Sequence, residues 1–135
     1  MKEVLAMLLA HIYFNKNDFK NAKIYYLLEL KYITTKKDKL KRINKIANQY
    51  FEKESYTTSA FWYQKAFEYG DENVLYNLAY SYQKRKKYTK AIRIYKMILK
   101  NNNDTSSMNN LSIIYRNIGN QPISDYWYKK SQRVK

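Results

Sequence analysis

The side chains that could do chemistry are few in this chain of 135 residues. It has no cysteine and a single histidine, His11, so the sequence offers neither a thiolate nucleophile nor paired imidazoles for a metal. The acidic neighbours Asp71 and Glu72 fall at a predicted helix start, where carboxylates usually cap the helix or face its dipole. Two glycines far apart cannot form a phosphate-binding loop. The sequence therefore predicts a protein that is not an enzyme and has no metal or cofactor.

Positive charge is the next property that limits function. The net charge is +15, and after Glu72 only Asp104 and Asp125 oppose thirteen lysines and arginines. Such a field attracts acidic proteins, nucleic acid phosphates or anionic membranes. The basic runs at 36–42 and 84–87 fall at predicted turns, and no known nucleic-acid motif accompanies them. An acidic protein or peptide is thus the favoured partner, and nucleic acid binding through the basic C-terminal half is the alternative.

The first residues could be mistaken for a targeting signal, because Lys2 precedes an apolar run. Glu3 and His11 interrupt that run, and its residues fit a structural helix. No apolar stretch approaches the length of a membrane span. The sequence leaves the compartment unknown, but we expect a soluble module, with the cytoplasm favoured.

A repeated pattern of tyrosines and small residues indicates the secondary structure that positions the side chains of this chain. Four tyrosines recur 37, 32 and 33 residues apart, and a second tyrosine follows each of them after thirteen residues. A small residue lies three before each first tyrosine and another four before each second one, as expected where two helices of a hairpin approach closely. The tyrosines are Tyr13, Tyr50, Tyr82 and Tyr115, then Tyr26, Tyr63, Tyr95 and Tyr128; the small residues are Ala10, Ala47, Ala79 and Ser112, then Ala22, Ser59, Ala91 and Ser124.

These registers predict an all-α fold of four helix pairs. Asp18, Ser55 and Asp38 are the expected N-caps of three helices, and Pro122 suits the first turn of the last one. Only Gly119 provides a turn glycine; in the other hairpins Asn17, Glu54 and Lys86 take that position. The longer connector before the second pair predicts an irregular stacking joint and not a domain boundary. The pairs are predicted at 3–15 with 19–32, 39–52 with 56–69, 72–84 with 88–100, and 105–117 with 122–133.

Over residues 3–133 the chain resembles a tetratricopeptide repeat array. The segments LAHIYFNKNDFKNAKIYY (9–26) and LAYSYQKRKKYTKAIRIY (78–95) match the two-helix pattern of that family, and AFWYQKAFEYGDENVLYNLAYSY (60–82) also resembles the related Sel1-like repeats. The resemblance implies a right-handed α-solenoid of about four hairpins within one domain, 1–135. Its repeats would be about 3–34, 38–71, 72–104 and 105–135.

The resemblance also implies a concave groove lined by the first helix of each pair, where such arrays bind protein segments. The groove would run from an apolar end, with Val4, Met7, His11 and Phe14, to a polar and cationic end. Amides along it could pair with the backbone of an extended peptide, and basic residues could hold carboxylates. The predicted partner-binding residues are Lys41, Asn44, Asn48, Asn73, Tyr76, Asn77, Tyr80, Lys84, Asn109, Asn110 and Arg116.

The function that follows from these expectations is a noncatalytic scaffold or adaptor that binds a peptide or protein segment. A self-assembly module is a further alternative, because Tyr126 and Trp127 lie on the last predicted helix, where an array normally presents a solvated surface. The sequence thus leaves open whether a homo-oligomer forms through the C-terminal helix.

Overall fold

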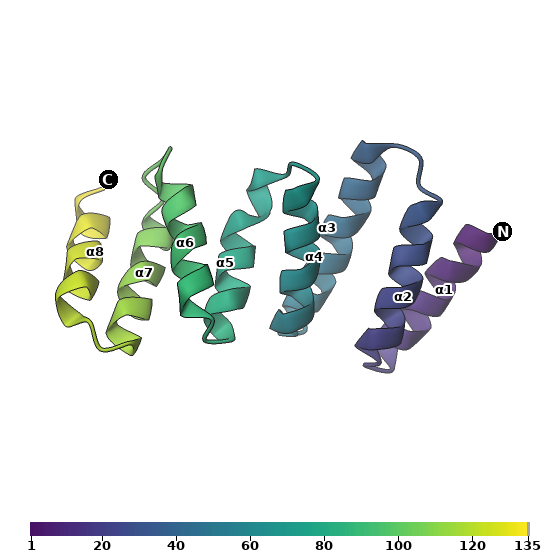
Figure 1. Ribbon diagram of the computed structural model, residues 1–135, viewed down its shortest axis with the longest axis horizontal. Helices are drawn as coiled ribbons and strands as arrows, with labels where there is room; N and C mark the ends of the chain where they lie inside the picture. The colour runs from purple at the N-terminus through teal and green to yellow at the C-terminus, as the bar shows by residue number, and fades with distance from the viewer. Residues whose placement is uncertain (135) are drawn as a thin grey trace.

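The structure is a computed structural model that describes residues 1–134, and over these residues it consists of helices and turns without a strand. Eight α-helices and one short 3-10 helix follow one another as antiparallel hairpins placed side by side (Figure 1). The predicted all-α solenoid of four hairpins is confirmed. The helices are α1 Lys2–Asn15, α2 Phe19–Lys31, α3 Lys36–Glu52, α4 Tyr56–Glu68, η1 Glu72–Val74, α5 Leu75–Lys84, α6 Tyr88–Leu99, α7 Thr105–Asn117 and α8 Gln121–Arg133.

Side-chain caps are present at some of the helix starts. Ser55 is the N-cap residue of α4, as predicted, but its side chain makes no capping hydrogen bond. Asp18 accepts a hydrogen bond from the Asn21 backbone N–H, as predicted. The prediction that Asp38 caps the second pair is wrong, because α3 begins earlier: Thr35 is its N-cap and accepts from the Asp38 N–H at 3.1 Å. Asp38 then lies in the first turn, where its charge faces the helix dipole.

The turn inside each hairpin is the same local structure in all four copies. Asn17, Glu54 and Lys86 each have φ of +59°, and Gly119 has φ of +86°, as the sequence register predicted. The next residue then donates its N–H to the carbonyl of the repeat tyrosine five residues back, at 2.8–2.9 Å. This bond satisfies a carbonyl at the end of the first helix. The repeat tyrosine and the left-handed residue therefore belong to one motif.

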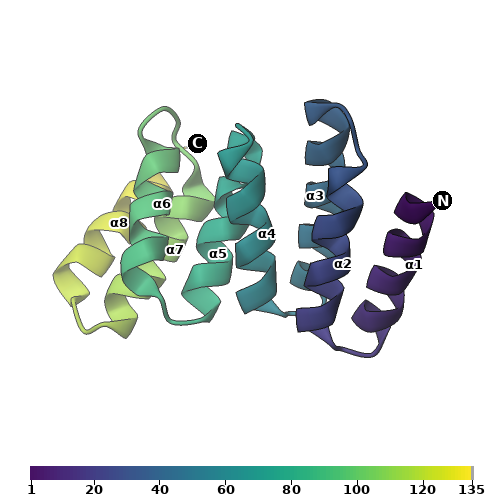
Figure 2. The ribbon, with the colours of Figure 1, turned by 45° about the vertical axis from the view of Figure 1, so that its right-hand side comes forward.

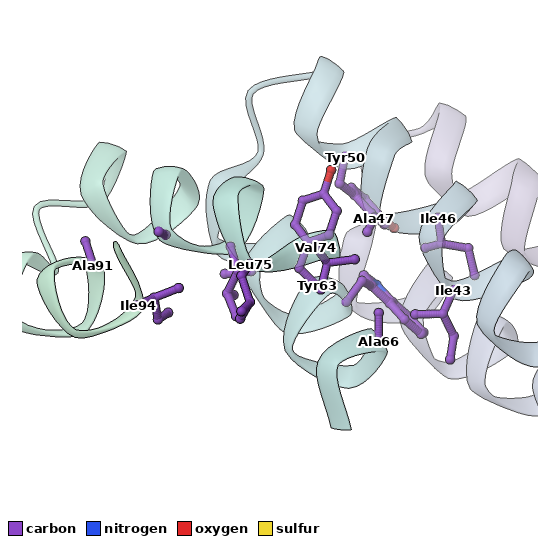
Figure 3. Close-up of a cluster of buried hydrophobic side chains, with 14 of the residues drawn as sticks. Ile43, Ile46, Ala47, Tyr50, Tyr63, Ala66, Val74, Leu75, Ala91 and Ile94 are labelled. Carbon is purple, nitrogen blue, oxygen red and sulfur yellow. The ribbon is translucent and has the colours of Figure 1, made fainter. Parts of the chain in front are cut away.

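The core lies between the helices of each hairpin and between successive hairpins. All eight small residues of the repeat are buried, and so are Tyr26, Tyr50, Tyr63 and Tyr95. Figure 3 shows Ala47, Tyr50 and Tyr63 in part of this core. At the contact of α4 with α5, the Oγ atoms of Ser59 and Ser81 are 3.0 Å apart. Tyr13, Tyr82 and Tyr115 are half-buried, whereas Tyr128 is exposed, because no further hairpin among the described residues packs on α8.

The joint between α2 and α3 differs from the other two joints between hairpins. Close backbone approaches are fewer there than between α4 and α5. Gln49 occupies the register of Ser81, and the large side chains of Tyr26 and Tyr50 pack across the wider gap, with ring centroids 6.3 Å apart. The Arg42 Nε–Glu29 Oε2 ion pair, at 2.9 Å, also bridges the two helices. Larger side chains thus replace the close serine contact.

Candidate partner-binding surface

Two adjoining hollows lie along the first helices of the second, third and fourth hairpins, and Tyr76 of α5 lines both. The larger, of about 760 Å³, lies between α5 and α7, and the smaller, of about 410 Å³, lies where α3, α4 and α5 meet. We call the two together the Tyr76 surface. Its residues are Phe51, Glu52, Glu54, Tyr56, Glu72, Asn73, Leu75, Tyr76, Asn77, Tyr80, Ile98, Asn102, Asn103, Asp104 and Ser106.

Four of the eleven predicted binding residues line this surface: Asn73, Tyr76, Asn77 and Tyr80. The other seven lie outside the two hollows: Lys41, Asn44, Asn48, Lys84, Asn109, Asn110 and Arg116. A role in partner binding remains a prediction for all eleven.

Most of the predicted amide row is hydrogen-bonded within the chain. The Tyr63 hydroxyl donates to Asn48 Oδ1 and accepts from Asn77 Nδ2 at 3.2 Å, so it links α3 to α5 through α4. Asn110 Nδ2 donates to the Tyr76 hydroxyl at 2.8 Å, from α7 to α5. Asn44 Nδ2 donates to Asp71 Oδ2 at 2.8 Å. These amides therefore help to connect neighbouring hairpins, which is a structural reason for asparagine on the first helices.

The hydroxyls of Tyr56, Tyr63 and Tyr76 have a raised pKa and are neutral at neutral pH. Burial raises the pKa of Tyr63 and of Tyr76, and the amide bonds from Asn77 and Asn110 offset this only in part. Burial, and after it the nearby Glu54 carboxylate, raises the pKa of Tyr56. The surface therefore presents uncharged rings beside carboxylates.

Those carboxylates are the feature that the sequence analysis missed. Glu52 and Glu54 line the smaller hollow, Glu72 and Asp104 line the larger, and no lysine or arginine lines either. Among residues 1–134 the single ion pair is that of Arg42 with Glu29, so no basic side chain pairs with these four. Each lies at a turn or helix end of the repeat, a register that could have been read from the sequence. The positive net charge of the whole chain gives no indication that this surface carries negative charges.

The basic side chains lie mainly elsewhere. Lys90, Arg93 and Lys96 are exposed and follow one another at spacings of three along α6, a second helix of its hairpin. Lys84 lies near the Tyr76 surface, with its Nζ 5.8 Å from the centroid of the Tyr80 ring. Lys84 and Arg116, which were predicted at the cationic end of the groove, line neither hollow.

The N-terminal part of the predicted groove also differs from expectation. Phe14 is buried, with its ring centroid 5.0 Å from that of Tyr50, and so cannot line a groove. His11 is exposed and lines a separate hollow of about 350 Å³ with Met7 and Arg42. Within residues 1–134 no group of histidine and acidic side chains could hold a metal ion. No helix in this range is both long and apolar enough to cross a bilayer.

Comparison with known proteins gives the fold and no family. No protein-family model matches the chain, and no curated protein sequence matches it. Solved structures of MamA are similar. One of MamA AMB-1 is 17% identical with a TM-score of 0.70, covering 96% of this chain and 70% of that one. A MamA point mutant is 16% identical with a TM-score of 0.72, covering 98% and 97%.

A further crystal structure of MamA is 16% identical with a TM-score of 0.61, and covers 98% of this chain and 91% of that one. The chain therefore has the tetratricopeptide-like helical solenoid fold of these structures. At such low identity the likeness supports the fold alone.

Proposed function

We propose that this protein is a noncatalytic scaffold that binds a segment of another protein along the Tyr76 surface. The observation that carries the proposal is that two hollows adjoin at one side chain, Tyr76, and together extend from the end of α3 to the start of α7. An extended segment could occupy both hollows in succession and pass over Tyr76. Solenoids of this type use such elongated surfaces for binding.

The chemistry of the surface suits a polypeptide. Asn73, Asn102 and Asn103 are exposed around the larger hollow and can each donate and accept hydrogen bonds with a peptide backbone. Leu75 and Ile98 supply apolar contact at the same hollow. A mixture of apolar floor and polar rim is typical of protein interfaces.

The charge of the partner has two separate contributions. At long range the net charge of +15 favours an acidic protein and increases its rate of encounter at low salt. At contact distance the carboxylates of the hollows act instead, because salt screens charges more than about 10 Å apart. We propose an acidic partner protein whose bound segment is itself not acidic.

The absence of cysteine allows a direct test. Peptides selected from a random library on the immobilised protein should protect the cysteine introduced by Asn73→Cys from a maleimide reagent. The same peptides should leave the cysteine introduced by Arg93→Cys reactive, because Arg93 is exposed on α6. Equal protection at both positions, or selection of no peptide, would contradict the proposal.

The same two variants test the nucleic acid alternative. Phosphate contacts would give an oligonucleotide affinity that falls steeply with salt and ignores sequence. Protection of the Arg93→Cys cysteine by such an oligonucleotide, without protection at Asn73→Cys, would favour that alternative.

Self-association through α1 is a second candidate, favoured by the exposure of this helix. Leu5, Leu8 and Ile12 are 58%, 50% and 46% exposed. The residues at the register of Leu5 in the third and fourth hairpins, Val74 and Ser107, are buried. The outer side of α1 is thus a hairpin-stacking face that nothing covers within residues 1–134.

The opposite end of the solenoid is better solvated. Gln121 and Gln132 of α8 occupy registers that hold aromatic or aliphatic residues in the other three hairpins. Trp127 packs against the core, whereas Ile123, Tyr126 and Tyr128 remain exposed. Pairing through the C-terminal helix, which the sequence suggested, is therefore less favoured than pairing of α1 with α1 of a second copy. Each α1 carries one lysine and one glutamate, so local repulsion does not oppose it.

Sedimentation velocity tests this second candidate. Leu8→Glu should shift a dimer to monomer, and added salt should strengthen the wild-type dimer by screening the repulsion between cationic copies. Ile118→Glu is the control, because Ile118 is also 50% exposed but lies at the end of α7. A wild-type protein that stays monomeric at all concentrations would exclude this candidate.

A further inference from the structure

The smaller hollow of the Tyr76 surface is surrounded by aromatic rings from three helices. The ring centroid of Phe51 is 5.7 Å from that of Tyr56 and 5.7 Å from that of Tyr80, and the centroids of Tyr56 and Tyr80 are 6.0 Å apart. Tyr76 stacks on Tyr80 with centroids 6.5 Å apart. We call this opening of about 410 Å³ the aromatic hollow.

Two carboxylates lie at the edge of the aromatic hollow. Glu52 and Glu54 are exposed at the end of α3, line the hollow, and form no ion pair within the described chain. The faces of aromatic rings are the negative part of their quadrupole. Rings and carboxylates therefore attract the same kind of group, a cation.

A cation of the chain itself already lies beside these rings. Lys84 Nζ is 5.8 Å from the Tyr80 centroid, within the distance of about 6 Å at which an ammonium is attracted to a ring. Lys84 is exposed and does not line the hollow. Its position indicates the electrostatic preference of the rings but leaves the opening accessible.

We propose that the aromatic hollow receives a cationic side chain, arginine or lysine, from the segment bound to the Tyr76 surface. This inference depends on the proposed function and names the chemistry that its partner brings. Arginine fits best, because its planar guanidinium stacks on rings and can bind a carboxylate through two hydrogen bonds. An acidic side chain would be repelled by Glu52 and Glu54. A purely apolar one would leave these carboxylates less solvated and unpaired.

The test compares two peptides of the same shape that differ in charge. The probes are acetyl-Gly-Arg-Gly-amide and the same peptide with citrulline, the uncharged analogue of arginine, each titrated into the full chain and followed by amide and aromatic chemical shifts. We expect shifts at residues 51–56 and 76–80, with the arginine peptide binding about three- to tenfold more tightly than the citrulline peptide.

Two variants separate the contributions of ring and carboxylate. Tyr80→Leu should abolish the preference for arginine, and Glu54→Gln should reduce it about two- to threefold. Glu68→Gln and Tyr32→Leu change exposed residues outside the hollow and should leave the preference unchanged. Circular dichroism of each variant controls for loss of helix.

The outcomes separate this inference from the proposed function. Equal affinity for the two peptides, shifts confined to other parts of the chain, or no shift at all would overturn the cationic assignment. If library peptides without arginine or lysine still protect the Asn73→Cys cysteine, the proposed function holds and the cationic assignment fails. If no library peptide protects it, the proposed function itself fails.

Discussion

At the scale of single residues, a left-handed backbone conformation at three turns lowers the stability of the fold, and glycine at these positions would relieve the strain. Lys86 has φ of +59°, a left-handed conformation that a residue with a Cβ adopts at a cost of about 1–2 kcal/mol. The fourth hairpin has Gly119 at the same register, with φ of +86° and nothing within 4 Å of where a Cβ would lie. The left-handed conformation is thus required by the position in the repeat, whichever residue type occupies it.

We predict that Lys86→Gly raises the free energy of unfolding by about 0.5–1 kcal/mol, because the relief of the left-handed conformation exceeds the extra entropy of glycine in the unfolded chain. Urea denaturation measures the change. Arg85→Gly is the control: Arg85 precedes Lys86 and has φ of −87°, so the same replacement there should lower stability. An equal effect of the two variants would exclude the strain.

The residue scale also shows how much could be predicted from the sequence. The positive-φ positions and the buried small residues were predictable, because each depends on a register that repeats four times. The partners of Asn48 and Asn110 were not, because their bonds to Tyr63 and Tyr76 depend on how one hairpin rotates on the next. Burial of Phe14 was missed for the same reason: the ring of Tyr50, from the next hairpin, packs against it.

At the scale of helices, the joint between α2 and α3 depends on an ion pair of low exposure. Glu29 is buried, and its partner Arg42 reaches it from the next hairpin at 2.9 Å. Removing only one member of such a pair leaves an uncompensated buried charge and lowers stability. Replacing both members with apolar residues can leave the free energy of unfolding nearly unchanged. The longer connector predicted an irregular joint here, but its ion pair could not be read from spacing.

We predict that Arg42→Met lowers the free energy of unfolding by about 3 kcal/mol, because Glu29 then stays buried without a partner. Adding Glu29→Met to this variant should restore most of the loss. Lys45→Met, at an exposed position of α3, should change stability little. A double variant no more stable than Arg42→Met alone would mean that the pair contributes through packing and not through charge.

At the scale of the whole molecule, helices α1 and α8 close the two ends of the row in both views of the chain (Figures 1 and 2). The core between them contains buried phenol rings as well as aliphatic side chains. Burial raises the pKa of Tyr26, Tyr50, Tyr63, Tyr76 and Tyr95. Protonation of these phenols is therefore linked to folding of the entire solenoid.

The sign of this linkage is definite. Phenols in the unfolded chain ionise near pH 10, whereas the buried ones keep their protons, so the unfolded state binds fewer protons above that pH. The stabilisation is complete below about pH 10 and is lost as the pH rises further. We expect these five phenols to ionise together with the loss of helix, measured by near-ultraviolet absorbance and circular dichroism in one titration. Ionisation of these five at full helix content would contradict their burial.

Charge distribution is the property of the whole molecule that sequence composition described least well. The sum of +15 correctly suggests long-range attraction of acidic partners, but it does not give the sign of any one hollow. Four of the eleven carboxylates line the Tyr76 surface because they lie at helix ends and turns beside the first helices. The composition therefore predicts the long-range electrostatic field of the protein. The positions of the charged groups on the Tyr76 surface become visible only in the folded structure.

The most direct measurement is a chemical-shift map of the whole chain with a peptide selected from a random library. We expect the largest amide shifts at residues 51–56, 72–80 and 102–106, which contain most of the Tyr76 surface, and small shifts on α8 and at residues 90–96 of α6. Shifts concentrated on the basic face of α6, at Lys90, Arg93 and Lys96, would contradict the assignment of the Tyr76 surface as the place where this solenoid binds its partner.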